Sequence, residues 1–271
     1  MMRQRSCIYM LFLCLFFVFG CATPPPKADL EAYNAFLETN DPLEPLNRSV
    51  FTFNQFVDKL LWQPAARTYR DVVPLWVRQR IGSALDNLRA PVIFVNDVLQ
   101  GEMNRAMTTL ARFSFNSTLG IAGLHDIASD MGLKQHDEDF GQTLAVWGST
   151  PGPYIILPIL GPSNPRDAAG RVVDYLLDPF NAWADNTGRE NLAYARTGVA
   201  LLHARAGLLD VTDDLEKNAI DPYAATRSIY RQNRAHAISN GNANSPAVLS
   251  APSDFPSLDD RVDSNTLSGK P

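Results

Sequence analysis

The sequence predicts a mainly α-helical protein, and two observations on its patterning support this prediction. Apolar residues recur every three to four positions through most of the chain, which is the spacing of a helix with one apolar face. No alternating run of apolar and polar residues is long enough to build a sheet, and no segment repeats with a period of roughly 20 to 50 residues. We therefore expect little or no β structure, and one domain of short, bent amphipathic helices over residues 41–236.

A stretch of 25 residues interrupts this helical pattern. Residues 141–165, GQTLAVWGSTPGPYIILPILGPSNP, contain no charged side chain, five prolines and four glycines. Proline removes backbone donors and glycine permits turns, so this Gly/Pro-rich segment fits neither a long helix nor a central strand, and it is too broken to span a membrane. Two interpretations stay open from these residues alone: a buried core loop, or irregular backbone that lines an apolar cavity.

Before this stretch, the spacing predicts several helices. Residues 46–62 form the first, and its apolar face is so broad that it suits either core packing, which we favour, or a lipid interface. Pro64 and Pro74 are expected to bracket a polar connection. Residues 75–89 form the next helix, and we expect Pro91 to end it.

A segment over residues 92–99 then stops at Gly101, and residues 102–115 form a further helix. One face of that helix carries an apolar stripe that we interpret as core and not as a binding groove: Met103, Ala106, Met107, Leu110 and Phe113.

Candidate acid–base residues occur in two places beyond this helix. Residues 116–124 predict a helix end or tight loop, and His125 with Asp126 follows. Residues 136–139 read His-Asp-Glu-Asp. Because neither place has the spacing of a metal or catalytic motif, we interpret both as solvated loops.

After the central stretch, a helix that starts near Arg166 is ended by Pro179, a turn region begins at Trp183, and residues 191–209 form another helix. An acidic helical patch and a last helix from Asp221 follow. This last helix aligns three guanidinium groups along one side: Arg227, Arg231 and Arg234. A solvated face is the default interpretation, and a contact with phosphate headgroups or an acidic partner is the alternative.

The amino-terminal residues predict a secreted lipoprotein. Arg3 and Arg5 precede an apolar run of 13 residues, Cys7–Phe19, which has the length of a signal peptide and not of a membrane anchor. Gly20 before Cys21 matches a bacterial lipobox, so we expect a signal peptide over residues 1–20 and a lipid on Cys21. The next residue is not aspartate, which favours the outer membrane of a Gram-negative cell, on the periplasmic side.

The remaining composition limits the function. Residues 21–40 predict a proline-rich tether and residues 237–271 a disordered tail. Removal of the two signal-peptide arginines takes the net charge from −5 to −7, which argues against binding nucleic acid. There is no G-x-S-x-G serine elbow and no phosphate loop, so we expect no catalysis, no metal and no cofactor apart from the covalent lipid.

Several segments, taken in order behind the lipobox, resemble the MlaA (VacJ) family of outer-membrane lipoproteins. They are DPLEPLNR from Asp41, NDVLQGE from Asn96, FGQTLAVWG from Phe140, GPYIILPILGPSNPRDAAG from Gly152 and DPY from Asp221. The resemblance covers roughly residues 41–234. It implies helices that form a ring or disc around a central amphipathic channel, through which misplaced outer-leaflet phospholipid is passed to a periplasmic carrier, MlaC.

The resemblance also implies contact with an outer-membrane porin trimer, and control of passage by a glycine-bearing loop near residues 147–154, with Gly148 and Gly152 as flexible points. It favours the cavity interpretation of the central stretch. We assign the channel lining, loop or membrane-facing rim to a further set: Tyr154, Leu157, Ile159, Phe51 and Phe53. The three arginines of the last helix are assigned to headgroup or partner contact. A structural porin-associated lipoprotein and a lipoprotein esterase are the alternatives.

Overall fold

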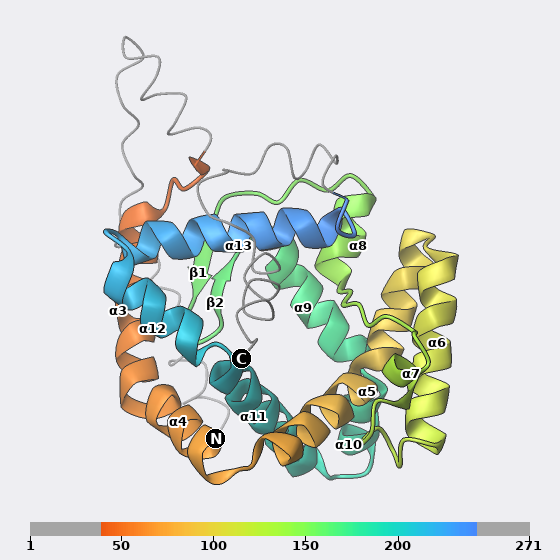
Figure 1. Ribbon diagram of the computed structural model, residues 1–271. Helices are drawn as coiled ribbons and strands as arrows, with labels where there is room; N and C mark the ends of the chain where they lie inside the picture. The colour runs from red at the N-terminus through yellow and green to blue at the C-terminus, as the bar shows by residue number, and fades with distance from the viewer. Residues whose placement is uncertain (1–38, 243–271) are drawn as a thin grey trace, which may run out of the picture. The chain divides into compact units, whose positions relative to one another are not determined.

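A computed structural model describes residues 39–242 of the protein (Figure 1). The predicted signal peptide, Cys21, nearly all of the tether and the tail from residue 243 lie outside the described residues. The described chain divides into two compact units, one of residues 39–56 with 152–165 and the other of residues 57–151 with 166–242. Helices dominate and one two-stranded sheet is present, so the predicted helical class is confirmed. The predicted domain bounds stay a prediction.

The first unit joins one helix to one hairpin. Helix α3 covers Glu44–Val57, and the strands β1 (Ile155–Leu157) and β2 (Gly161–Ser163) pair antiparallel, with Ile156 opposite Pro162. The uncharged stretch therefore contributes both strands. Its turn needs positive φ at Ile159 (68°) and Gly161 (79°), a conformation that glycine adopts readily and a β-branched residue seldom does.

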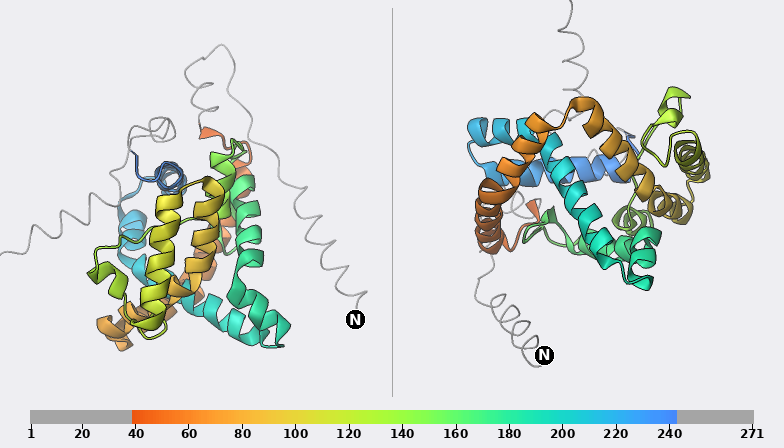
Figure 2. Two further views of the ribbon diagram at one scale, coloured as in Figure 1. Left: turned by 90° about the vertical axis from the view of Figure 1, so that its right-hand side faces the viewer. Right: turned by 90° about the horizontal axis from the view of Figure 1, so that it is seen from below.

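The second unit contains the remaining elements. They are η1 (Asp58–Trp62, a π-helix), α4 (Gln63–Val72), α5 (Leu75–Gln100), α6 (Met103–Thr118), α7 (Ile127–Asp130), α8 (Phe140–Val146), α9 (Pro165–Leu177), α10 (Pro179–Asn186), α11 (Glu190–Gly207), α12 (Leu209–Asn218) and α13 (Pro222–Ile238). Helices α5 and α6 pack side by side as a hairpin (Figures 1 and 2). A small apolar cluster of Ala66, Ala206 and Leu209 joins α4, α11 and α12.

Several predicted boundaries are correct because the local signals are strong. Gly101 ends α5 with a left-handed φ of 81°, and Asp221 caps α13 by accepting hydrogen bonds from the backbone N–H groups of Tyr223 and Ala224. The segment after α6 forms the predicted turns.

The proline-based breaks are wrong in two places. Pro64 is the second residue of α4, which continues without a break from the π-helix η1, so the expected polar connection is a helix. Pro91 lies inside the continuous helix α5, which runs for 26 residues. Trp183 is also helical, within α10. Tertiary packing thus overrides the local proline signal at Pro91.

Candidate functional site

The buried side chains of the described residues are unusually polar. The fully buried set includes Asn47, Asn96, Asp97, Glu138 and Thr143, whereas most of the buried apolar positions are alanine. Charged residues are almost never fully buried in a water-soluble protein unless they are paired. The interior therefore has to be held together by hydrogen bonds and ion pairs.

The large apolar side chains lie on the outside instead. Helix α6 shows this most clearly, because Met103, Met107 and Leu110 are 55%, 62% and 42% exposed. Its opposite face buries Thr109 and Arg112 against the rest of the unit. The prediction that the stripe forms core holds for Ala106, which is buried, and is wrong for Met103, Met107 and Leu110, which point outward.

Two other helices follow the same inverted arrangement. Helix α9 buries Arg166 and Asp167 and exposes Val172 and Leu176. In the first helical region, Phe53, Phe56, Leu60 and Leu61 are exposed, so core packing was also the wrong choice there. Large exposed apolar side chains gathered on one helix face mark a site that another apolar phase covers.

The first part of the buried network centres on Asp97 of α5. Its carboxylate accepts hydrogen bonds from Thr109 Oγ1 (2.7 Å) and lies 3.0 Å from His136 Nε2. Glu138 next to it accepts from Arg105 Nη2 (2.6 Å) and Gln100 Nε2 (2.8 Å). Burial raises the pKa of Glu138 above its ordinary value, against these two donors.

These contacts correct the interpretation of both histidine segments as solvated loops. Glu138 is 1% exposed, and Asp126 forms a paired contact with Arg112 Nη2 at 2.8 and 2.9 Å while capping α7. Each segment anchors a loop to α6 through an ion pair. Within the described residues, no cluster of three His, Cys, Asp or Glu side chains could hold a metal ion.

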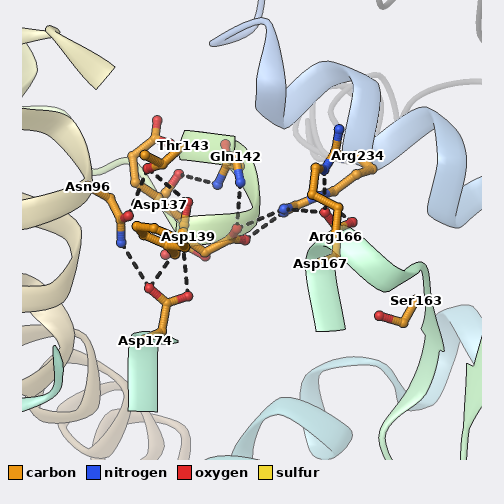
Figure 3. A network of polar contacts seen from close by, with 12 residues as sticks. Asn96, Asp137, Asp139, Gln142, Thr143, Ser163, Arg166, Asp167, Asp174 and Arg234 are labelled. Atoms are coloured by element: carbon orange, nitrogen blue, oxygen red, sulfur yellow. Dashed lines mark hydrogen bonds and ion pairs between the residues drawn. The ribbon is translucent and has the colours of Figure 1, made fainter. Parts of the chain in front are cut away.

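The second part of the network surrounds Arg234 of α13 (Figure 3). Its guanidinium donates to both carboxylate oxygens of Asp139 (2.5 and 2.7 Å) and to Asp167 Oδ1 (3.0 Å). Tyr230 Oη donates to Asp167 Oδ2 at 2.6 Å. Burial raises the pKa of Asp139, but the hydrogen bonds and charge of Arg234 outweigh this effect, so its pKa lies below the ordinary value.

This second part requires two glycines. A Cβ on Gly141 would lie 2.5 Å from Arg234 Nη2, and a Cβ on Gly170 would lie 2.4 Å from the backbone nitrogen of Gly141. Helices α8 and α9 therefore approach backbone to backbone, which brings Asp139 and Asp167 within reach of one arginine. The close approach of the helices is what makes the shared ion pair possible.

A third part ties α5, α8 and α9 together. Asn96 Nδ2 donates to Asp174 Oδ1 (3.0 Å), and Thr143 Oγ1 donates to Asn96 Oδ1 (2.8 Å). The backbone N–H of Phe140 also donates to Asp174. All three parts lie in the second unit, and together they connect five of its elements without a large apolar core.

The hairpin of the first unit is held by asparagines of α3. Asn47 donates to the carbonyl oxygen of Tyr154 (3.0 Å) and accepts from the N–H of Ile156 (2.9 Å), as a neighbouring strand would. Asn54, two turns further along the helix, contacts Leu157 and Ile159 in the same way. The side-chain amides thus replace a third strand.

The structure brings most of the predicted channel and loop residues into this first unit. Tyr154 is buried, Leu157 is half-buried and Ile159 is exposed at the hairpin turn. On α3, Phe53 is exposed and Phe51 is half-buried. Phe53 and Ile159 thus present apolar side chains to the surroundings, whereas Tyr154 packs inside the unit.

The two predicted flexible glycines fall on different sides of the unit boundary, which lies between residues 151 and 152. Gly148 has a φ of 88° with open space around it, and Gly152 has a φ of 74° with Pro165 beside it. Both conformations are left-handed, so a side chain at either position would strain the backbone.

The three arginines of α13 have different surroundings. Arg227 lies over the ring of Tyr223 at 5.5 Å, whereas Arg234 is committed to Asp139 and Asp167. The default prediction of a solvated face is therefore wrong for Arg234. Its role in the structure is to join α13 to α8 and α9.

One hollow among the described residues is small and is lined mainly by polar residues. A cavity of about 30 Å³ in the second unit is lined by residues that include Asn87, Thr109, Arg112, Asp126 and His136. This volume accommodates one or two water molecules, and ligand pockets are typically about 300–1,000 Å³. This cavity is therefore too small for a lipid.

Charged side chains inside and apolar side chains outside define a class of protein that is built to be surrounded by lipid. No helix in the described part of the chain is long and apolar enough to cross a bilayer. The fold and the network thus define an α-helical protein that buries polar side chains and exposes apolar helix faces.

The chain belongs to the MlaA lipoprotein family, because the model of that family matches residues 39–237. An uncharacterized protein of Rickettsia felis is 36% identical over 206 residues, which cover 76% of this chain and 80% of the relative. The intermembrane phospholipid transport system lipoprotein MlaA of Escherichia coli is 35% identical over 213 residues, or 76% and 81% of the two chains.

A solved structure described as "Structural basis for maintenance of bacterial outer membrane lipid asymmetry" is also similar. It matches with a TM-score of 0.64 and 33% identity, over 73% of this chain and 98% of the other. The family resemblance drawn from the sequence is confirmed.

The sequence interpretation missed the buried network, although a signal for it was present. Its members lie in the segments that carry the family resemblance: Asn96, Asp97 and Gln100 in NDVLQGE, Gly141 and Thr143 in FGQT, and Arg166, Asp167 and Gly170 in the segment that ends RDAAG. Asn, Asp and Gln in the otherwise apolar last part of α5, residues 90–100, indicate a polar buried face.

Proposed function

We propose that this protein is an outer-membrane lipoprotein that provides an amphipathic passage for phospholipids. In this proposal it removes misplaced phospholipid from the outer leaflet and passes it to a periplasmic carrier, which maintains lipid asymmetry. The single observation that carries the proposal is the inverted distribution of side chains, with apolar helix faces outside and a hydrogen-bonded polar network inside. Relatives in the same family bear the name of an intermembrane phospholipid transport lipoprotein.

A phospholipid needs an apolar environment for its acyl chains and a polar one for its headgroup. The exposed faces of α6 and α9 supply the first, and side chains from the edges of the polar network supply the second. The chain carries no phosphate loop for a nucleotide, so the free energy for net transport has to come from a lipid gradient or a partner.

We further propose that Cys21 is lipidated, that the protein contacts a porin trimer and an MlaC-like carrier, and that it lies on the periplasmic side of the outer membrane. Multiple acyl chains, at about 0.8 kcal/mol per buried methylene, anchor a protein durably. Residues 147–154 are proposed as the gating loop, because both of its glycines are left-handed and the boundary between the two compact units falls within it.

The test is the amount of phospholipid in the outer leaflet of a deletion strain, measured by labelling of surface-exposed phospholipid. The strain is complemented with the wild type or with Cys21→Ala. We expect surface phospholipid to rise on deletion and to return to normal only with the lipidated protein. An unchanged outer leaflet in the deletion strain would reject transport and favour a purely structural role beside the porin.

We propose no bond-breaking step for this protein. An esterase would hydrolyse a short-chain ester and lose that activity when one serine is replaced. Ser149 and Ser163, the serines of the uncharged stretch, are the ones to replace with alanine in that assay.

A further inference from the structure

Helices α10 and α11 meet at a corner where an arginine lies over an exposed tryptophan. The guanidinium carbon of Arg189 is 5.5 Å from the centroid of the Trp183 ring, and Trp183 is 42% exposed. Leu192 and Tyr194, in the first turns of α11, are exposed to 46% and 69%. The corner therefore combines one cation, one indole and an apolar surface.

The neighbouring arginine, Arg196, differs from Arg189 because it is paired with a carboxylate. Arg196 lies 5.1 Å above the ring of Phe180, which packs against Trp183, and its charge is neutralised by Asp178 at 2.6 Å. Arg189 is exposed, and no carboxylate of a described residue forms an ion pair with it, although Asp185 and Glu190 are close in sequence. Of the two stacked arginines at this corner, only Arg189 therefore carries a charge that no described carboxylate balances.

An unbalanced arginine above a tryptophan has the chemistry to bind a phosphodiester at the edge of an apolar phase. Arginine binds phosphate through paired hydrogen bonds, and stacking on the ring holds its plane in place. Tryptophan and tyrosine concentrate where lipid headgroups meet acyl chains. The exposure of Trp183, Leu192 and Tyr194 suits a lipid of the surrounding leaflet better than a transported molecule.

We propose that Arg189 and Trp183 form an interfacial anchor that binds the phosphodiester of a bilayer phospholipid and sets the depth of α10 and α11 at the membrane surface. This inference deepens the proposed function, since it rests on the protein lying in a bilayer. It does not depend on the passage of lipid through the protein.

The test uses full-length lipidated protein labelled with 5-fluorotryptophan, in nanodiscs of phosphatidylethanolamine that contain a lipid with a nitroxide on its headgroup. Single Trp→Phe variants assign the four fluorine resonances. We expect the nitroxide to broaden the Trp183 resonance. Because this broadening falls with the sixth power of distance, Arg189→Gln is expected to weaken it several-fold.

The matched control is Lys134→Gln, which removes one positive charge from another exposed position. It is expected to leave the Trp183 resonance unchanged, and the other three tryptophan resonances report whether each variant is folded. A Trp183 resonance that is sharp in the wild type, or equally broad in the Arg189 variant, would overturn the proposal.

A second experiment distinguishes binding of a bilayer phospholipid from binding of a transported phospholipid. In discs of uncharged glycolipid, the Trp183 shift should grow with the mole fraction of added phospholipid. Saturation at one phospholipid per protein would identify a cargo site and overturn the anchor. Lipid transfer is assayed on the same wild-type sample, so a protein that fails to move lipid but retains the Trp183 contact rejects the proposed function alone.

Discussion

At the scale of single residues, the protein depends on charges that are buried together with their partners. Arg234 satisfies two carboxylates at once, and it can do so because Gly141 and Gly170 leave no side chain between α8 and α9. Removal of one partner from such a group leaves an uncompensated charge, which is costlier than losing a surface ion pair. The exposed pair Arg48–Glu44 is such a surface ion pair, and its loss should cost little stability.

Gly170→Ala should destabilise the protein, because its Cβ would lie 2.4 Å from the backbone nitrogen of Gly141, which cannot rotate away. We expect a loss of about 1–3 kcal/mol in the free energy of unfolding, typical of overpacking. The control is Gly198→Ala in α11, where no atom lies within 4 Å of the added Cβ. That change should raise stability by up to about 1 kcal/mol.

Both values come from denaturant unfolding in the same detergent, followed by circular dichroism. If Gly170→Ala proved as stable as Gly198→Ala, the close approach of α8 and α9 would not be required for folding.

The pKa of Asp139 predicts a dependence of stability on pH. Its pKa is lower in the folded protein than in the unfolded chain, since Arg234 stabilises the charged form. The unfolded chain therefore binds the proton first as the pH falls. The contribution of Asp139 is present above the ordinary aspartate pKa and is lost as the pH falls below it.

Asp139→Asn removes this proton-linked contribution while keeping a side chain that caps α8. In unfolding experiments between neutral and acidic pH, the wild type should lose stability more steeply below the ordinary aspartate pKa than the variant. Parallel curves for the two proteins would contradict the assignment.

At the scale of elements, the helices have the usual amphipathic spacing, but their polar faces point inward and their apolar faces point outward. In a water-soluble domain the orientation is the reverse. Helix α6 directs Arg112 and Asn116 inward and Met103 and Met107 outward. Spacing along the sequence reports that a helix has two different faces. It does not report which face points to the interior, because that depends on what surrounds the protein.

The outward face of α6 should contribute to membrane binding. A triple variant, Met103→Gln, Met107→Gln and Leu110→Gln, should weaken partitioning into phospholipid vesicles by about 100-fold, at about 1 kcal/mol for each half-exposed side chain. The measurement uses the full chain with Cys21→Ala, so that acyl chains do not mask the difference. Circular dichroism should show an unchanged helical content.

The control for this variant replaces exposed polar residues of the same helix: Asn104→Gln, Ser114→Gln and Thr118→Gln. It should partition like the parent protein. If both triple variants bound vesicles equally well, the α6 face would have to be covered by something other than lipid.

At the scale of the whole molecule, the buried network and the exposed apolar faces depend on each other. Ion pairs are strongest where water is excluded. In the proposed membrane location, lipid would keep water from the outside of a domain that has only a small apolar core. The same lipid accepts the apolar faces that water would penalise. The deletion experiment under the proposed function tests this arrangement in the cell.

Much of the fold could be predicted from the sequence. The helical spacing and the caps at Gly101 and Asp221 are local signals that predict the structure correctly. Residues 141–165 are not one element, as predicted, but they supply most of α8 and both strands. The segments behind the lipobox also specify the family. Pro91 was misread, because a helix that gains enough packing tolerates the lost hydrogen bond.

The sequence by itself determined the class, since helix periodicity, turn residues and family motifs act over short distances along the chain. Only the tertiary structure decided which faces are buried and which polar residues share partners. Arg234 and Asp139 are 95 residues apart in the sequence, and helical spacing cannot indicate that two residues so far apart form an ion pair. Burial and ion pairing depend on distances in space, and a periodic pattern in one chain does not contain those distances.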